Sequence, residues 1–135
     1  MAGKRYLLDT NCLIWFQENN PKIPKSVMAE IQNVQNAILF SQVSLFEIAI
    51  KLKIGKLPDF KVTVENVYLQ ALGDGFTFVG IQNEHIYNYQ NIPLFEDHRD
   101  PFDRLLIAAA QKENAIILSP DAKLNLYNKT IKVIW

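Results

Sequence analysis

We predict from the amino-acid sequence a three-layer α/β/α fold around a mainly parallel central sheet of about five strands. Short runs that are apolar throughout alternate with longer segments of helical spacing, and 49% of the 135 residues are apolar. Strands without polar positions are typical of parallel sheets that helices cover on both faces. A chain of this length and composition can bury one core, so we expect residues 1–135 to form a single domain.

The first part of the chain predicts two strands and two helices. Residues 6–8 form a buried strand that leads into a helix over 10–18. The next helix begins near Pro24 and places three apolar side chains on one face: Val27, Ile31 and Val34. Residues 37–40 then form the second strand.

A third helix is expected to begin at Ser44, because Glu47 follows it at the spacing of a capping box. This helix ends near Gly55 and buries one apolar stripe: Leu45, Ile48, Ala49 and Leu52. Another helix over 64–72 and a strand over 76–79 follow.

The last part of the chain carries the clearest signals. A short helix over 82–89 precedes Asp100-Pro101, which starts a helix that runs to about Glu113, because proline suits the first turn. The chain then shows a strand, a short helix and a final strand: 115–118, a segment opened by Ser119, and 131–134.

Composition excludes several classes of protein. Fourteen Lys and Arg balance fourteen Asp and Glu, so the chain is neither a strongly basic nucleic-acid coat protein nor an acidic tail. The longest apolar stretch, 105–110, is far shorter than the roughly 20 residues that cross a membrane. Residues 1–5 show no secretory signal, and the lone Cys12 reads as a core residue, so we expect a cytoplasmic protein without membrane contact.

Four acids occur where the predicted strands end. Asp9 directly follows the first strand, and Asp121 comes just after the fourth. Glu47 and Asp103 lie in the first turns of the helices that follow other strands. Ligands of such sheets bind beyond the carboxyl ends of the strands, so we expect all four carboxylates to converge on one rim.

A structural role can explain most of these acids one at a time. Acids in a first helical turn meet the helix dipole, which is worth about 0.3–1 kcal/mol. This does not account for Asp9, because an acid directly after a buried strand is poorly placed for solvation. Clustered carboxylates repel one another unless a cation binds them, and oxygen-only ligands suit Mg²⁺ or Mn²⁺ rather than Zn²⁺. We interpret His85 as a surface residue and His98 as part of a solvated charged loop.

The motifs around these acids resemble those of PIN domains and, more narrowly, of the VapC-type toxins of type II toxin–antitoxin systems. Four segments carry the resemblance in order: Leu7-Leu8-Asp9-Thr10-Asn11, residues 44–51 with Gly55-Lys56-Leu57, His98-Arg99-Asp100-Pro101-Phe102-Asp103-Arg104-Leu105-Leu106, and Ser119-Pro120-Asp121. The resemblance covers residues 6–135 and implies a Mg²⁺-dependent endoribonuclease. The family's catalytic quartet falls on Asp9, Glu47, Asp103 and Asp121.

A mechanism follows as a hypothesis. Asp9, Asp103 and Asp121 would hold Mg²⁺, with Mn²⁺ as a possible substitute, and Glu47 would orient a water molecule or hold a second ion. Cleavage would leave a 5′-phosphate and a 3′-hydroxyl. Asp100 ranks below the quartet because helix capping accounts for it. Basic residues near the acids are expected to guide the RNA backbone: Lys51, Lys53, Lys56, Arg99 and Arg104.

The resemblance also implies partners. Thr10 and Asn11 match the polar pair that supports the first aspartate, a cognate antitoxin would block the site, and the toxin would form a homodimer. The apolar run 12–16 covers its helix all round, so we expect Trp15 or Phe16 to contact the antitoxin or a second protomer. Two alternatives stay open: a housekeeping PIN nuclease without an antitoxin, and a non-catalytic RNA-binding or scaffold PIN domain.

Overall fold

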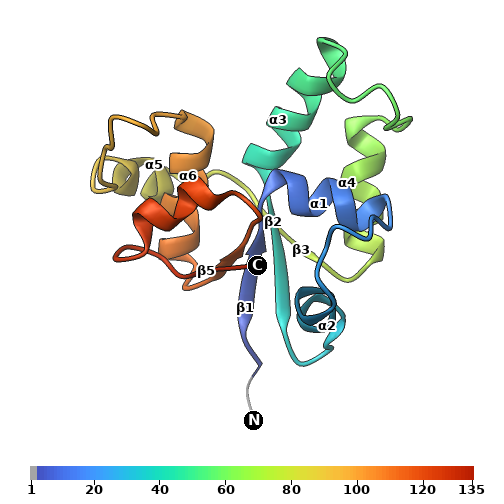
Figure 1. The fold of residues 1–135 in the computed structure, drawn as a ribbon, viewed down its shortest axis with the longest axis horizontal. Coiled ribbons are helices and arrows are strands. Elements are labelled where there is room, and N and C mark those ends of the chain that lie inside the picture. Colours follow the sequence, from blue (N-terminus) through green and yellow to red (C-terminus); the bar gives the residue numbers. More distant parts are fainter. Residues whose placement is uncertain (1–2) are drawn as a thin grey trace.

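A computed structural model of the chain describes residues 3–135 and has the predicted α/β/α architecture (Figure 1). Met1 and Ala2, part of the N-terminal segment interpreted above, lie outside the described residues. Five strands form one sheet in the order β3-β2-β1-β4-β5, and each neighbouring pair is parallel. The strands are β1 (Arg5–Leu8), β2 (Ala37–Ser41), β3 (Thr77–Val79), β4 (Ile116–Leu118) and β5 (Val133–Ile134). The predicted parallel sheet is therefore confirmed.

Helices connect the strands in the expected places. They are α1 (Thr10–Gln17), α2 (Lys25–Gln32), α3 (Gln42–Lys53), α4 (Val64–Gly73), α5 (Asn83–Tyr89), α6 (Pro101–Lys112) and the 3₁₀ helix η1 (Ala122–Tyr127). Among residues 3–135, no helix combines the length and the apolar character that a membrane span requires.

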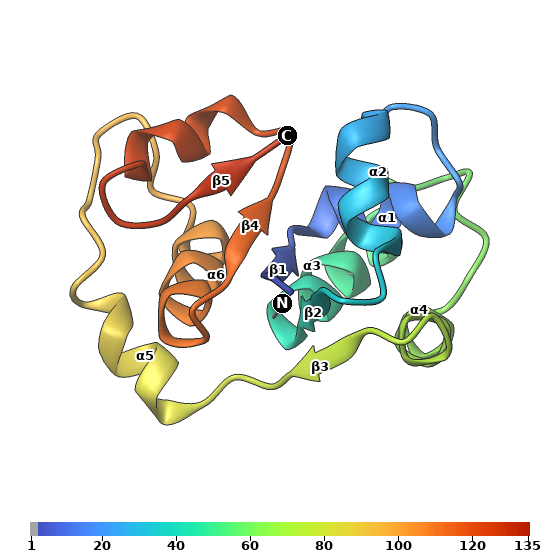
Figure 2. The same cartoon turned by 90° about the horizontal axis from the view of Figure 1, so that it is seen from below.

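The central strand β1 separates two cores. Tyr6, Leu7 and Leu8 are each completely buried, as expected for a strand covered on both faces. Tyr6 and Leu8 belong to the core that α1 to α4 cover, whereas Leu7 belongs to the core under α5, α6 and η1. Figure 2 shows these two groups of helices on opposite sides of the strands. This alternation of side chains produces the three layers.

Helix α3 begins earlier than predicted. Ser41 is its N-cap and accepts a hydrogen bond from the Val43 amide through Oγ, 3.0 Å away. Ser44 is buried inside the first turn, so the predicted capping box with Glu47 is wrong. The physical reason is that β2 pairs with β3 up to Ser41, opposite Val79, and the chain can turn only where that pairing ends. Glu47 consequently lies in the second turn of α3.

Helix α2 ends before the predicted apolar face is complete. Val34 lies beyond the helix and is 91% exposed, which corrects its expected place beside Val27 and Ile31. Asn33 causes the early end, because its side-chain oxygen accepts a hydrogen bond from the Gln35 amide at 2.9 Å. Such a local turn competes with continuation of the helix.

Candidate active site

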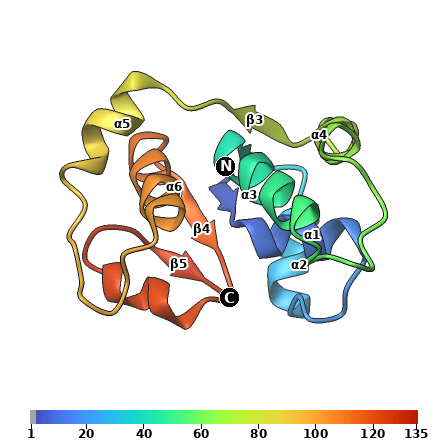
Figure 3. The same ribbon diagram turned by 90° about the horizontal axis from the view of Figure 1, so that it is seen from above.

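The central strands of the sheet end at the point where the strand order reverses, which is where ligands of open α/β sheets bind. Figure 3 shows β1 and β4 side by side there, with α3 and α6 on either side. Asp9 directly follows β1 and is 7% exposed. Its Oδ1 accepts a hydrogen bond from the Cys12 amide at 2.7 Å, and its Oδ2 accepts one from the Ser119 hydroxyl after β4.

Asp9 is therefore also the N-cap of α1. This corrects the expectation that helix termini do not account for Asp9. A cap needs only one carboxylate oxygen, however, and the second oxygen of the buried Asp9 accepts the hydrogen bond from Ser119. Its position between two central strands follows from the topology, which brings residues 110 positions apart into contact.

Glu47 reaches the same region from α3. Its Oε1 accepts a hydrogen bond from the Thr10 hydroxyl at 2.7 Å, and the Ser44 hydroxyl lies 3.0 Å from that of Thr10. Thr10 thus supports Glu47 rather than Asp9, which corrects the role that the family resemblance implied for it. Ser44 contributes here as a buried polar neighbour instead of a helix cap.

Asp103 lies in the first turn of α6, as predicted, and Asp100 is the N-cap of that helix. The Asp100 carboxylate accepts hydrogen bonds from the amides of Phe102 at 2.9 Å and Asp103 at 3.4 Å. The Asp103 carboxylate lies 2.9 Å from Nε2 of His98. His98 is buried, with 5% exposure, so its interpretation as a solvated loop residue was wrong.

Asp121 completes the group from the segment after β4. It caps η1 by accepting a hydrogen bond from the Lys123 amide, so this short helix begins after Asp121 and not at Ser119 as expected. One potential ligand atom from each of His98, Asp103 and Asp121 lies within 4.8 Å of the others. The structure therefore brings together the acids that the sequence placed at the strand ends, and it adds a histidine.

Burial and mutual repulsion act on three of these carboxyls. Burial raises the pKa of Asp9 from 3.8 to about 6; the bonds from Ser119 and Cys12 oppose this rise, and the charges of Asp103 and Glu47 add to it. Burial is also the main cause that raises the pKa values of Glu47 and Asp103. A bound cation would offset the repulsion and the burial cost that raise these pKa values.

The metal-free protein should lose stability as the pH rises from about 4 to about 6. The folded state holds the Asp9 proton more tightly than the unfolded chain, so only the protonated form favours folding. Asp9→Asn should abolish this contribution, and the difference in unfolding free energy between variant and parent should grow by about 2–3 kcal/mol over that range. Urea unfolding in EDTA at several pH values measures it. A difference in unfolding free energy that stays constant with pH would contradict the raised pKa of Asp9.

The basic residues that were predicted to contact RNA differ in their exposure. Arg99 is exposed and Lys51 is half-buried beside Glu47, where its charge partly opposes the rise that burial causes in the pKa of that carboxyl. Arg104 is only 4% exposed, and its guanidinium donates to the carbonyls of Ile92 and Pro93 at 2.9 and 3.0 Å. The expectation that Arg104 contacts RNA is corrected, because its donors are used inside the protein.

A second group of titratable side chains lies away from the four acids. His85 is 1% exposed, which corrects its interpretation as a surface residue. Its Nδ1 accepts a hydrogen bond from the Gln82 amide at 3.1 Å, and its Nε2 lies 3.3 Å from a Glu113 oxygen. The ring therefore carries its proton on Nε2 and donates it to Glu113. This arrangement joins α5 to the end of α6 and has a structural role.

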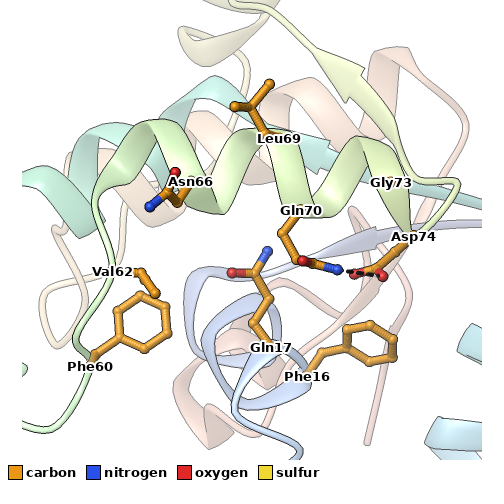
Figure 4. A pocket seen from close by; sticks show the side chains of 9 residues that line it. All are labelled: Phe16, Gln17, Phe60, Val62, Asn66, Leu69, Gln70, Gly73 and Asp74. Carbon is orange, nitrogen blue, oxygen red and sulfur yellow. Dashed lines mark hydrogen bonds between the residues drawn. The ribbon is translucent and has the colours of Figure 1, made fainter.

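A groove with both polar and apolar side chains lies between α1 and α4. Figure 4 shows Phe16 and Gln17 of α1 facing α4 across a groove of about 620 Å³. Phe16 and Trp15 are each half-buried: Phe16 packs on Phe76 and Trp15 on Trp135, with ring centroids 5.1 and 5.9 Å apart. Neither ring is fully covered, so the expected partner surface stays a prediction. The groove does not include the four acids.

The contacts of His98, Ser119 and Tyr127 could not be predicted from the sequence. Tyr127 lies 29 positions from His98, and Ser119 lies 110 positions from Asp9. The position of His98 five residues before Asp103 was the one local signal, since it places the histidine next to the helix that carries an acid.

Comparison with known proteins agrees with this geometry. The family model of the PIN domain matches residues 6–129. No curated protein matches the chain.

Similar solved structures share the fold over nearly the whole chain. VapBC2 from Rickettsia felis, bound to a DNA fragment from its promoter, contains a chain with a TM-score of 0.67 and 14% identity over 96% of this chain and 97% of that chain. DNA-bound VapBC from Salmonella typhimurium contains a chain with a TM-score of 0.65 and 14% identity over 97% of each chain. A toxin–antitoxin complex from Klebsiella pneumoniae contains a chain with a TM-score of 0.53 and 20% identity over 87% of this chain and 88% of that chain. At these identities the likeness concerns the fold.

Proposed function

Because this chain belongs to the PIN domain family, we propose that it is a metal-dependent endoribonuclease of the VapC toxin type, formed by one nuclease domain over residues 1–135. The convergence of Asp9, Glu47, Asp103 and Asp121 at the carboxyl ends of the strands carries the proposal. Helix capping accounts for some of these acids. It does not explain why the buried Asp9 and three less buried acids gather at the switch point of the sheet.

The donor set fits a hard divalent cation. Asp9, Asp103 and Asp121 offer carboxylate oxygens, which Mg²⁺ and Mn²⁺ prefer, and we propose them as the metal-holding residues. When bound, such an ion neutralises phosphate charge and makes water more acidic. We propose that Glu47 orients the attacking water, and the hydrogen bond from the Thr10 hydroxyl supports this by holding its carboxylate. Ser119 and the Cys12 amide hold the Asp9 carboxylate in one orientation.

The test of this function is cleavage of RNA by the purified protein. We expect cleavage with Mg²⁺, loss of cleavage in EDTA, and recovery with Mn²⁺. Sequencing of RNA ends, in the cell and in the test tube, should find 5′-phosphates and 3′-hydroxyls that are missing with Asp9→Asn. Cleavage by the Asp9→Asn protein at the parent rate would rule out the proposed site.

Lys51 and Arg99 are proposed to contact the RNA backbone near the acids. Each phosphate contact adds about one unit to the dependence of affinity on salt. Arg99→Gln should therefore weaken binding of RNA to a cleavage-defective Asp103→Asn protein and reduce the salt slope by about one. Fluorescence anisotropy at several salt concentrations measures both. Lys129→Gln, an exposed residue beyond η1, is the control, and an equal effect of both changes would contradict the assignment.

We propose that the cognate partner is an antitoxin that covers the site and that the toxin also forms a homodimer. The VapBC neighbours support an antitoxin, and the half-buried Trp15 and Phe16 offer an apolar surface for either partner. A neighbouring small reading frame for a DNA-binding protein would distinguish this from a housekeeping PIN nuclease. Co-expression with that protein should restore growth and suppress RNA cleavage.

A further inference from the structure

His98 connects Asp103, one acid of the site, to Tyr127 at the end of η1. Its Nδ1 lies 2.7 Å from the Tyr127 hydroxyl, and its Nε2 lies 2.9 Å from Oδ2 of Asp103. The rings of Tyr127 and His98 meet edge to face at 5.4 Å, and Phe95 packs on the other part of Tyr127 at 5.0 Å. Both rings are almost fully buried, so neighbouring side chains fix their orientation.

The chemistry of the groups gives the direction of the hydrogen bonds. An ionised carboxylate can only accept, so Nε2 of His98 must donate to Asp103. A neutral imidazole then accepts at Nδ1, and the Tyr127 hydroxyl is the donor available there. The hydroxyl's other contact, the His98 carbonyl at 3.4 Å, is longer. The Asp103 carboxylate therefore sets the tautomer of His98, and Tyr127 anchors the ring at its other nitrogen.

We propose that His98 is a positioning residue that fixes the Asp103 carboxylate for metal binding, and that Tyr127 anchors the His98 ring in the orientation this requires. The hydrogen bond to Oδ2 fixes the orientation of the Asp103 carboxylate, which has a potential ligand atom within 4.8 Å of one from Asp121. Without it the carboxylate can turn about its last bond. Partners of this kind, which contact a ligand rather than the metal, affect metal affinity by about 10–100-fold. The inference rests on the proposed metal site.

The test compares His98→Ala, His98→Gln and Tyr127→Phe with the parent. Calorimetric titration measures Mg²⁺ and Mn²⁺ affinity, and RNA cleavage is measured alongside. We expect His98→Ala to weaken Mg²⁺ affinity by about tenfold or more. His98→Gln should recover most of this loss, because its amide nitrogen places a donor near the position of Nε2. Tyr127→Phe should give a smaller loss, since His98 keeps its bond to Asp103 but loses its anchor at Nδ1.

His85→Ala is the matched control. His85 is the other histidine of the chain, is equally buried, and bonds to Glu113 instead of an acid of the site. Its loss should lower the melting temperature without changing Mg²⁺ affinity. Nitrogen-detected NMR of the ring adds a direct readout, in which the proton of His98 should lie on Nε2 in the parent.

The outcomes separate the inference from the function. A parent that neither binds Mg²⁺ nor cleaves RNA overturns both. A parent that does both, with His98→Ala indistinguishable from His85→Ala in affinity, overturns only the role of His98. His98→Gln could also fail to recover the metal affinity and could lose more affinity for Zn²⁺ than for Mg²⁺. That result would make His98 a metal ligand and overturn the positioning role. If His98→Ala does not fold, Tyr127→Phe and the NMR measurement decide. The proposal is then overturned if Tyr127→Phe has unchanged Mg²⁺ affinity and the His98 ring of the parent carries its proton on Nδ1.

Discussion

Asp103→Asn is expected to reduce Mg²⁺-dependent RNA cleavage by more than about a hundredfold while the metal-free protein stays at least as stable as the parent. Burial and the charges of Asp100 and Asp121 raise the pKa of the Asp103 carboxyl, so removing its charge relieves repulsion. The Asn side-chain oxygen can still accept the hydrogen bond from His98. Mg²⁺ should raise the melting temperature of the parent but much less that of the variant, because only a bound ion stabilises by mass action.

Asp100→Asn is the control for this experiment. Asp100 caps α6 through the Phe102 amide, and Asn caps helices about as well as Asp. We therefore expect it to keep its fold and a large part of its activity. If Asp103 served only the helix dipole, Asp103→Asn would cost about 0.3–1 kcal/mol and leave cleavage intact. Full activity of purified Asp103→Asn, with contaminating nucleases excluded by a mock preparation, would rule out its catalytic assignment.

Arg104→Lys is expected to lower the free energy of unfolding by about 2 kcal/mol or more. The guanidinium binds two carbonyls with two different nitrogens and lies over the Tyr89 ring, 4.8 Å from its centroid. A lysine ammonium is a point donor and cannot reproduce this planar arrangement, so a buried carbonyl loses its partner. Arg104 has no salt-bridge partner within residues 3–135, and its Nε has no hydrogen-bond partner there.

Urea unfolding at neutral pH measures this effect. Arg99→Lys is the control, because Arg99 is exposed and its replacement should stay within about 0.5 kcal/mol of the parent. Equal stabilities of the two variants would show that the interior contacts of Arg104 contribute little.

Local patterns were sufficient for the sheet and for the positions of the acids. The strands 6–8 and 115–118 were predicted because an apolar run buried on both faces leaves its signal in consecutive residues. Asp100-Pro101 likewise determined the start of α6, since a cap and a first-turn proline act within a few residues. The placement of Asp9 and Asp103 followed, because the carboxyl ends of parallel strands lie at one edge.

The start of α3 was decided by tertiary structure. Ser41 and Ser44 both satisfy the local rule for a cap, and the pairing of β2 with β3 selects the first of them. The local capping-box spacing favours Ser44, because Glu47 follows it three residues later, and so it selects the wrong serine. Tertiary structure also decided the contacts of Asp9, whose hydrogen bond to Ser119 exists only because β1 and β4 are neighbours.

The sequence by itself determined which residue types stand at the ends of the strands, and hence that carboxylates gather there. Only the tertiary structure decided which charged and polar side chains are buried. His98, His85 and Arg104 all read as surface residues, yet each is at most 5% exposed. Their burial is stable because partners far along the chain, such as Tyr127, Glu113 and the Ile92 carbonyl, satisfy their hydrogen bonds. Local sequence carries no signal for a partner that only folding brings within reach.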